Sequence, residues 1–241
     1  MRAETRHQLK QDRFSRATFG AAEATAHWTA EHQTKLIVGG IVLAIVLAGV
    51  GGGWYYLNRE DQRASVDLNQ AVRTLDTPLR PAGAPPEPDS PSFTSVKERA
   101  TEAHKQFQTV VDKYPRTRTA EFARYFVGLT SAQMGDNAAA ERALKDVAST
   151  HNDDLAALAK LALAGIYRDT NRTKDAIDLY NGLIAKPTRS VGKVTAQVEL
   201  ADTYESSHQP AEAKRIYEQI QKENPASEVA QFATQKLQAL K

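Results

Sequence analysis

The chain has 241 residues, no cysteine, and 31 Lys and Arg against 29 Asp and Glu, which gives a net charge of +2. Without cysteine there are no disulfides, cysteine zinc sites, thiol nucleophiles or lipid anchors on an N-terminal cysteine. The near-neutral charge argues against a nucleic-acid binder, which needs a basic face. Alanine supplies 38 residues and aromatic residues only 7%, so the composition favours helices over a β-sandwich.

Residues 1–35 form a polar N-terminal tail. Trp28 is placed to anchor a short helix at a membrane interface, and a disordered tail with a single tryptophan is the equal alternative. His27 and His32 are five residues apart and do not share a helix face well, so the tail predicts no zinc pair.

Residues 36–57 are 22 positions without a charge, LIVGGIVLAIVLAGVGGGWYYL. As a helix they reach ~33 Å, enough to cross a hydrocarbon core of ~30 Å, and Trp54, Tyr55 and Tyr56 lie where an aromatic belt meets the headgroups. The alternatives are a buried core helix or a cleaved signal peptide. A core helix is rarely apolar all round for this length, and the 35 preceding residues are too many for a signal peptide. We therefore predict a retained transmembrane helix.

The orientation rests on the distribution of basic residues. The tail 1–35 carries six Lys and Arg against four in 58–92, whereas close to the membrane 16–35 carries two and 58–77 carries three. The positive-inside rule leans towards a cytoplasmic N-terminus, which places residues 58–241 outside the cytoplasm.

Small residues recur every fourth position along the apolar segment and form a packing ridge: Gly40, Ala44, Ala48 and Gly52. Such a ridge lets another membrane helix approach closely. The equal alternative is that glycine and alanine are simply common in membrane helices.

Residues 58–76 are predicted to continue as a membrane-proximal helix. Apolar residues follow the helical spacing i, i+4, i+7 and i+11, the last of them just beyond the helix: Leu68, Val72, Leu75 and Leu79. Residues 77–92 then hold six of the ten prolines, which no helix tolerates. This stretch is predicted to be an extended linker or loop.

Residues 93–241 are helical in pattern throughout and repeat with steps of 36 and 37 residues. Small residues are paired twelve positions apart: Gly128 and Ala140, Ala164 and Ala176, Ala201 and Ala213. A large residue follows four positions after each pair: Leu144, Tyr180 and Tyr217. A small residue lets two antiparallel helices pack closely and the large one fills the adjoining gap, so each unit is predicted to be a helical hairpin.

Turns are predicted around Gly135, Asn171 and His208, and prolines 115, 187 and 225 are expected to end the second helices. A leading half repeat from Ala103 to Pro115 lacks a first helix directly before it. The helix 58–76 is predicted to supply that partner, with the proline-rich stretch as an insertion between the two.

The spacing resembles the tetratricopeptide repeat in a degenerate form that lacks the tryptophan of the first helix. The predicted fold is all-α: one N-terminal transmembrane helix followed by a tetratricopeptide-like superhelix of antiparallel helical hairpins.

The layout resembles the YfgM-like proteins, ancillary subunits of the SecYEG translocon, through the tail "RHQLKQDRF", the segment "HWTAEHQTKLIVGG" and the ending "GGGWYYL". The resemblance implies a single-pass anchor in a bacterial inner membrane, a cytoplasmic N-terminus, periplasmic repeats, and the translocon and periplasmic chaperones as partners. The proline-rich insertion departs from that pattern. The outer-membrane assembly lipoproteins with similar repeats are disfavoured because the chain has no cysteine to carry lipid.

In this repeat class the first helix of each hairpin lines an inner wall. Aligned units place there Phe122, Tyr125, Leu129 and Ala132, then Leu158, Leu161, Gly165 and Arg168, then Thr195, Val198, Asp202 and Glu205. The wall is apolar in two units and acidic in the third, with Arg168 as its single cation, so a carboxylate clamp is not predicted. The predicted ligand is an apolar, basic-flanked extended segment that contacts Phe122, Tyr125, Leu129, Arg168, Asp202 and Glu205. Alternatively, the helix 58–76 fills the groove and makes Leu158 and Leu161 ordinary core.

Three functions follow from these patterns. The leading hypothesis is a membrane-anchored adaptor of the translocon that hands secreted chains to periplasmic folding factors. The second is an envelope scaffold for cell-wall or outer-membrane assembly machinery, and the third is an enzyme with an unrecognised site. No catalytic, cofactor-binding or metal-binding set is predicted, and protein and membrane partners are expected rather than nucleic acid.

Overall fold

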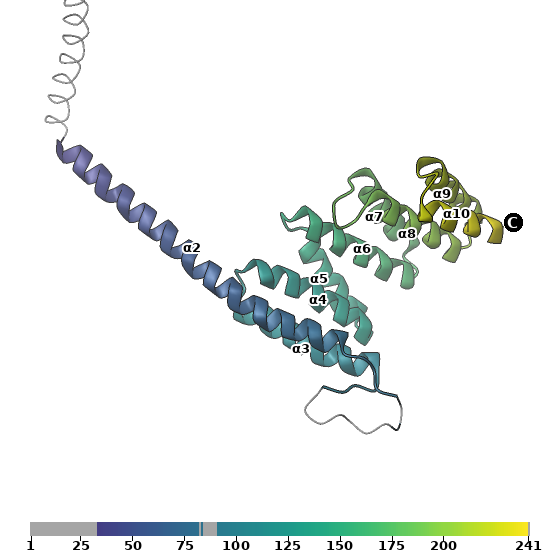
Figure 1. The fold of residues 1–241 in the computed structure, drawn as a ribbon, viewed down its shortest axis with the longest axis horizontal. Helices are drawn as coiled ribbons and strands as arrows, with labels where there is room; N and C mark the ends of the chain where they lie inside the picture. The colour runs from purple at the N-terminus through teal and green to yellow at the C-terminus, as the bar shows by residue number, and fades with distance from the viewer. Residues whose placement is uncertain (1–32, 82, 84–90, 241) are drawn as a thin grey trace, which may run out of the picture. The chain divides into compact units, whose positions relative to one another are not determined.

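The computed structural model describes residues 33–81, 83 and 91–240, and the chain divides into two compact units, residues 1–57 and 58–241. The predictions for Trp28 and most of the N-terminal tail lie outside the described residues. Helices dominate the described part of the chain (Figure 1).

The first unit contributes the beginning of helix α2 (Gln33–Asp76). Its large apolar side chains from residue 37 to residue 57 are exposed, and the most apolar window of the helix has no buried residue. This exposure contradicts the alternative of a core helix, which would be mostly buried. By length and composition α2 is a candidate membrane span.

The second unit begins with the remainder of α2, which packs against α3 (Val96–Lys113). Ala71, Leu68 and Leu75 lie in one apolar cluster with Phe107, which is fully buried. The fully buried Thr74 donates a hydrogen bond to the side chain of Gln106 (2.9 Å). The helix 58–76 therefore occupies the place of the missing first helix of the leading half repeat, as the sequence predicts.

The proline-rich stretch is closed at its base. Leu79 and Phe93 form an isolated parallel bridge, in which the backbone N–H of Arg80 donates to the carbonyl oxygen of Phe93 (2.8 Å). Arg99 of α3 donates to the carbonyl oxygen of Thr77 (2.8 Å), which ties the end of α2 to the start of α3. Phe93 is buried, so the two ends of the insertion meet on the apolar interior of the repeat unit.

Three helical hairpins and a final helix follow, and consecutive helices pack against each other (Figure 1). The pairs are α4 (Arg118–Met134) with α5 (Asn137–Ala148), α6 (Asp153–Asp169) with α7 (Thr173–Ala185), and α8 (Lys193–Ser206) with α9 (Pro210–Glu223). Helix α10 (Glu228–Ala239) packs on α9. The three second helices α3, α7 and α9 end two residues before prolines 115, 187 and 225, as predicted.

The turn inside each hairpin contains one residue in the left-handed region: Gly135 (φ 88°), Asn171 (φ 60°) and His208 (φ 59°). These positions recur with the predicted steps of 36 and 37 residues. Glycine adopts this backbone conformation freely, and asparagine and histidine are among the other residues that adopt it most often. All three predicted turns are therefore present.

The small and large residues of the repeat pattern lie in the interior. Gly128 is in contact range of Leu144, and both are buried. Ala164 and Tyr180 lie in one buried cluster, and Ala201 and Tyr217 in another. The positions that define the repeat in the sequence are thus the packing positions of the hairpins.

Candidate protein-interaction surface

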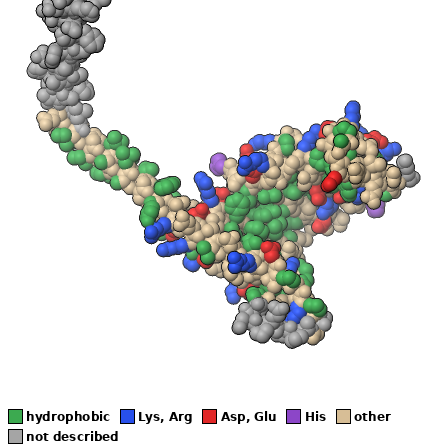
Figure 2. Space-filling view, viewed as in Figure 1, with side chains coloured by type: hydrophobic (Ala, Val, Ile, Leu, Met, Phe, Trp, Pro, Cys, Tyr) green, Lys and Arg blue, Asp and Glu red, His purple; other side chains and the backbone are tan. Residues whose placement is uncertain are grey.

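The predicted inner wall is formed by the first helices α4, α6 and α8. Figure 2 shows hydrophobic side chains gathered over a hollow in the repeat unit, and α4 and α6 are in direct contact. Of the predicted wall residues, Phe122 and Thr195 are exposed. The others are half-buried: Tyr125, Leu129, Ala132, Leu158, Leu161, Gly165, Arg168, Val198, Asp202 and Glu205. The wall is therefore neither closed core nor fully solvated.

Tyr125 packs on a neighbouring aromatic ring and keeps part of its side chain exposed. Its ring lies edge-to-face on Phe126 (centroids 5.5 Å apart), which in turn stacks on Phe107 (4.8 Å). Partial burial raises the pKa of the Tyr125 hydroxyl. A half-buried aromatic held by stacked rings is a candidate contact residue for a partner. Phe122, one turn earlier on α4, is 39% exposed.

Leu158 and Leu161 of α6 pack against the large apolar cluster that joins α5, α6, α7 and α8. The apolar residues of the helix 58–76 belong to two other clusters, shared with α3 and α4. In the described residues, then, the alternative in which the helix 58–76 fills the groove does not hold. Both leucines pack against the core and keep part of their surface exposed, so their role in an open wall stays a prediction.

Arg168, the cation predicted on the wall, is paired within the chain. Its guanidinium donates to Glu199 of α8 (2.9 Å) and to the adjacent Asp169 (3.2 Å). The ion pair with Glu199 links the second and third hairpins. Arg168 therefore acts as a structural link and offers only part of its charge to a partner.

Asp202 and Glu205 lie in a polar network with the last two helices. Tyr217 of α9 donates its hydroxyl to both carboxylates (2.8 and 2.6 Å), and Lys236 of α10 forms ion pairs with both (3.0 and 3.3 Å). Burial, together with the two carboxylates, raises the pKa of Tyr217. The acidic end of the wall is balanced inside the chain, which leaves less negative charge for a basic-flanked ligand than the sequence alone predicts.

Sequence reasoning missed the partners of these charges, Glu199 and Lys236. A signal was present in the spacing, because both pairs join residues about one repeat apart: Arg168 with Glu199 and Asp202 with Lys236. Glu141 and Arg172 follow the same rule (2.8 Å). Opposite charges at this separation meet either between successive hairpins, as here, or within one hairpin, as Asp153 and Lys186 do.

The ridge predicted on the apolar segment is exposed at all four positions, Gly40, Ala44, Ala48 and Gly52. A side chain added at either glycine would meet no atom within 4 Å. The surface is accessible to another helix, and its role in packing stays a prediction.

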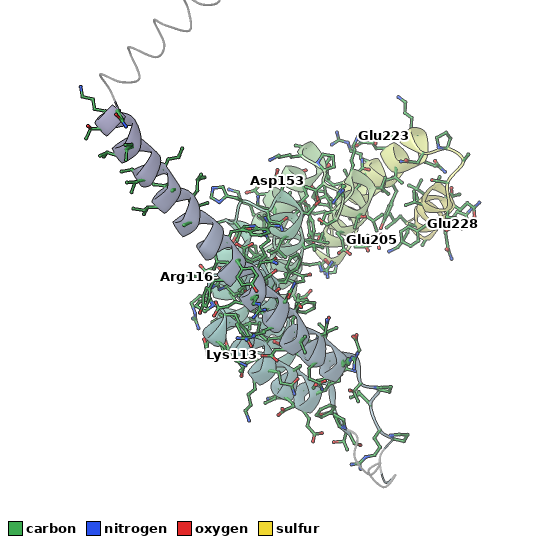
Figure 3. The ribbon with its side chains drawn as sticks, turned by 60° about the vertical axis from the view of Figure 1, so that its left-hand side comes forward. Lys113, Arg116, Asp153, Glu205, Glu223 and Glu228 are labelled. Carbon is green, nitrogen blue, oxygen red and sulfur yellow. The ribbon has the colours of Figure 1, made fainter. Side chains whose placement is uncertain are left out.

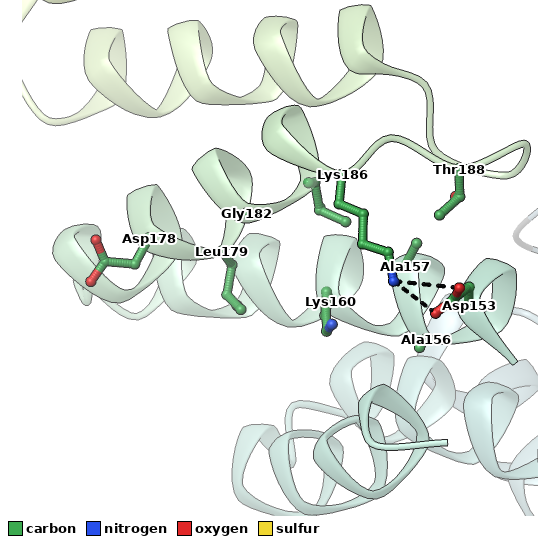
Figure 4. Close-up of a pocket in the computed structure, with 10 residues that line it drawn as sticks. Asp153, Ala156, Ala157, Lys160, Asp178, Leu179, Gly182, Lys186 and Thr188 are labelled. Atoms are coloured by element: carbon green, nitrogen blue, oxygen red, sulfur yellow. Dashed lines mark hydrogen bonds and ion pairs between the residues drawn. The ribbon is translucent and has the colours of Figure 1, made fainter. Parts of the chain in front are cut away.

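A separate cavity of about 210 Å³ lies between the two helices of the second hairpin (Figure 4). Ala157 and Leu179 line its apolar part, and Lys186 reaches Asp153 (3.3 Å) at its rim. Leu158, Leu161 and Arg168 do not line it, so it is distinct from the inner wall.

The family model for the tetratricopeptide repeat-like domain matches residues 26–241. The chain belongs to the tetratricopeptide repeat-like domain family. This match covers the apolar segment as well as the hairpins. Members with this fold are typically scaffolds for protein–protein interaction rather than catalysts.

Two solved structures show the same fold at low identity. The TPR-like repeats of a Podosopora anserina kinesin light chain share 18% identity with this chain and cover 74% of it and 85% of their own chain, with a TM-score of 0.55. A tetratricopeptide repeat protein from Parabacteroides merdae shares 16% and covers 74% of this chain and 60% of its own, with a TM-score of 0.52. No curated protein matches this chain significantly.

Proposed function

We propose that this protein is a membrane-anchored adaptor that binds proteins on the inner wall of its repeat domain. The single observation that carries the proposal is the half-buried apolar wall of α4 and α6, formed by Tyr125, Leu129, Leu158 and Leu161. Solvent-facing apolar residues on a rigid repeat scaffold favour docking of an apolar partner. The family membership supports protein partners in general.

The layout supports a more specific role as a YfgM-like ancillary subunit of the translocon. In this role residues 36–57 anchor the chain in a bacterial inner membrane, with the N-terminus in the cytoplasm and residues 93–241 in the periplasm. The proposed partners are translocon subunits, periplasmic chaperones and the unfolded secreted chains that pass between them. An unfolded chain exposes the apolar, extended segments that the wall suits.

The membrane topology is tested by adding protease to spheroplasts. Digestion of residues 93–241 with protection of the N-terminal tail is expected. If the repeat domain is protected in intact spheroplasts, both the orientation and the translocon role are wrong.

The partner is tested by crosslinking in the membrane, followed by mass spectrometry of whatever is attached. Translocon subunits or periplasmic chaperones are expected. Recovery of cell-wall or outer-membrane assembly factors instead would favour the envelope-scaffold function.

Tyr125→Ala tests the wall itself. Because Tyr125 is half-buried, its truncation should cost about 1–3 kcal/mol of unfolding free energy, less than the ~3–5 kcal/mol for a fully buried aromatic such as Phe107. Crosslinking to the partner should fall sharply in Tyr125→Ala. Phe107→Ala controls for stability, since Phe107 lies beneath the wall. A large loss of stability in Tyr125→Ala with unchanged crosslinking would refute the wall as the binding site.

A further inference from the structure

The loop between α3 and α4 is bonded to the part of α2 with which the second unit begins. The backbone N–H of Thr119 donates to the carboxylate of Asp61 (2.9 Å). Further along α2, Asp67 accepts a hydrogen bond from the Tyr114 hydroxyl (3.0 Å) and forms an ion pair with Lys113 (3.1 Å). Figure 3 shows Lys113 alongside α2. Contacts on both sides of the loop therefore fix it beside residues 61–67.

These contacts lie close in sequence to the apolar segment. Only three residues separate Leu57 from Asp61, so the chain itself keeps Asp61 within about 14 Å of Leu57. The headgroup layer extends roughly 5–8 Å beyond the hydrocarbon core on each side of a bilayer. Provided that residues 36–57 span the membrane, as the proposed function requires, Asp61 and the loop bonded to it are within reach of the headgroup layer.

The loop itself is basic, whereas the residues that flank it include Asp112 and Glu121. The run from Lys113 to Arg118, KYPRTR, has three cations and no acidic residue. Arg116 and Arg118 are exposed, and neither takes part in an ion pair among residues 33–81, 83 and 91–240. Of the α2 carboxylates in this region, Asp61 is bonded to Thr119 and Asp67 to Lys113, and Glu60 also takes part in an interaction. Figure 2 shows Lys and Arg side chains gathered around this part of α2.

The corresponding loop between α7 and α8 is also basic, but its cations are used inside the chain. The ion pairs are Lys186 with Asp153 (3.3 Å), Arg189 with Asp154 (3.6 Å) and Lys193 with Glu223 (2.9 Å). The α3–α4 loop thus differs in keeping two arginines for a partner outside the described chain.

We propose that the α3–α4 loop binds the anionic phospholipid headgroups of the membrane that residues 36–57 span, with Arg116 and Arg118 as the phosphate-binding residues. The planar guanidinium donates two parallel hydrogen bonds to phosphate oxygens, which a lysine does not. Near an anionic surface each basic residue shifts the bound-to-free ratio of the loop by about fivefold. The attraction decays over a Debye length of about 8 Å at physiological ionic strength, so it acts on the loop once the loop has come close to the headgroups.

The test uses the full chain reconstituted in vesicles of phosphatidylcholine, alone or mixed with phosphatidylglycerol. The natural sequence has no cysteine, so Pro115→Cys gives a single fluorophore site in the loop. A nitroxide on the phosphatidylcholine headgroup quenches a fluorophore that lies at the membrane surface. Quenching at residue 115 should rise when phosphatidylglycerol is present and fall again at high salt. A fluorophore at Ala138→Cys, at the start of α5, is the reference site.

Arg116→Gln with Arg118→Gln should reduce quenching to the level in phosphatidylcholine alone, a loss of about fivefold per arginine in the bound-to-free ratio. Arg142→Gln with Lys174→Gln is the matched control, since both residues are exposed cations elsewhere on the repeats, and it should change nothing.

The inference is wrong if quenching does not depend on lipid charge, or if it is unchanged in the variant with both loop arginines replaced. Arginines that bind an acidic protein would give this result. Failure of the chain to float with vesicles in alkaline carbonate would instead remove the membrane anchor, and with it both this inference and the proposed function.

Discussion

Replacement of Gly128 by alanine is the sharpest test of how the hairpins pack. Gly128 of α4 faces Leu144 of α5, and a Cβ added at Gly128 would lie 2.6 Å from the Leu144 Cγ and 2.8 Å from its Cδ2. Real Cβ contacts are essentially never so short. Leu144 is fully buried, so its side chain has no open space into which to move. The two helices must separate or Leu144 must leave its preferred rotamer.

The expected magnitude is the balance of two effects. Overpacking a filled core costs about 1–3 kcal/mol, whereas alanine is favoured over glycine inside a helix by about 1 kcal/mol. Gly128→Ala should therefore lower the free energy of unfolding by up to about 2 kcal/mol. Gly165 of α6 is the matched control, because a Cβ there would meet no atom within 4 Å. Gly165→Ala should gain the helix preference alone, about 1 kcal/mol.

The assay is urea unfolding of the full chain in mild detergent, followed by circular dichroism, with thermal melts as a second measurement. For a domain of this size 1 kcal/mol corresponds to about 2–4 °C in melting temperature, so the two variants should move in opposite directions or differ clearly. In a Leu144→Ala background the clash is absent, and Gly128→Ala should become stabilising. Equal stabilisation by Gly128→Ala and Gly165→Ala in the natural background would refute the close crossing of α4 and α5.

Two further predictions concern charges. The hydrogen bond from Lys145 and the ion pair with Arg172 lower the pKa of Glu141 to about 2, so its contribution to stability is present above pH ~4.5 and is lost as the pH falls towards 2. Urea midpoints measured above and below pH ~4.5 should therefore fall more on acidification in the natural protein than in Glu141→Gln. Lys236→Met should cost about 1–2 kcal/mol because it leaves two half-buried carboxylates side by side without their cation, whereas Lys214→Met, which breaks an exposed pair at 3.9 Å, should cost no more than about 0.5 kcal/mol. Equal unfolding free energies for these two lysine variants would contradict the structural role of Lys236.

The repeat was predictable because its signal is local. The pair Gly128 and Leu144 and the left-handed turn at Asn171 depend on spacing within one hairpin, which periodicity shows directly. The pairing of the helix 58–76 with α3 was also predictable, since a half repeat cannot bury its apolar face alone. The structure confirms both.

The candidate wall was only partly predictable. Its apolar positions follow from the alignment of the units, but the pairing of Arg168 with Glu199 depends on which turns of neighbouring helices meet in space. The same holds for Lys236, which lies on a helix outside the three aligned units and reaches back to Asp202. The sequence therefore overestimates the charge that the wall presents to a ligand. The division of the chain at residues 35, 57, 76 and 92 stays a prediction.

The proline-rich insertion, whose two ends are held together, is a suitable site for adding sequence. Because Leu79 and Phe93 are held together, the pairing of α2 with α3 does not depend on the length of chain between them. Doubling the length of such a loop raises the entropic cost of closing it by only about 0.6 kcal/mol. An epitope or a fluorescent reporter fused here would leave the hairpins and the inner wall intact, and related chains are free to vary in this stretch without altering the scaffold.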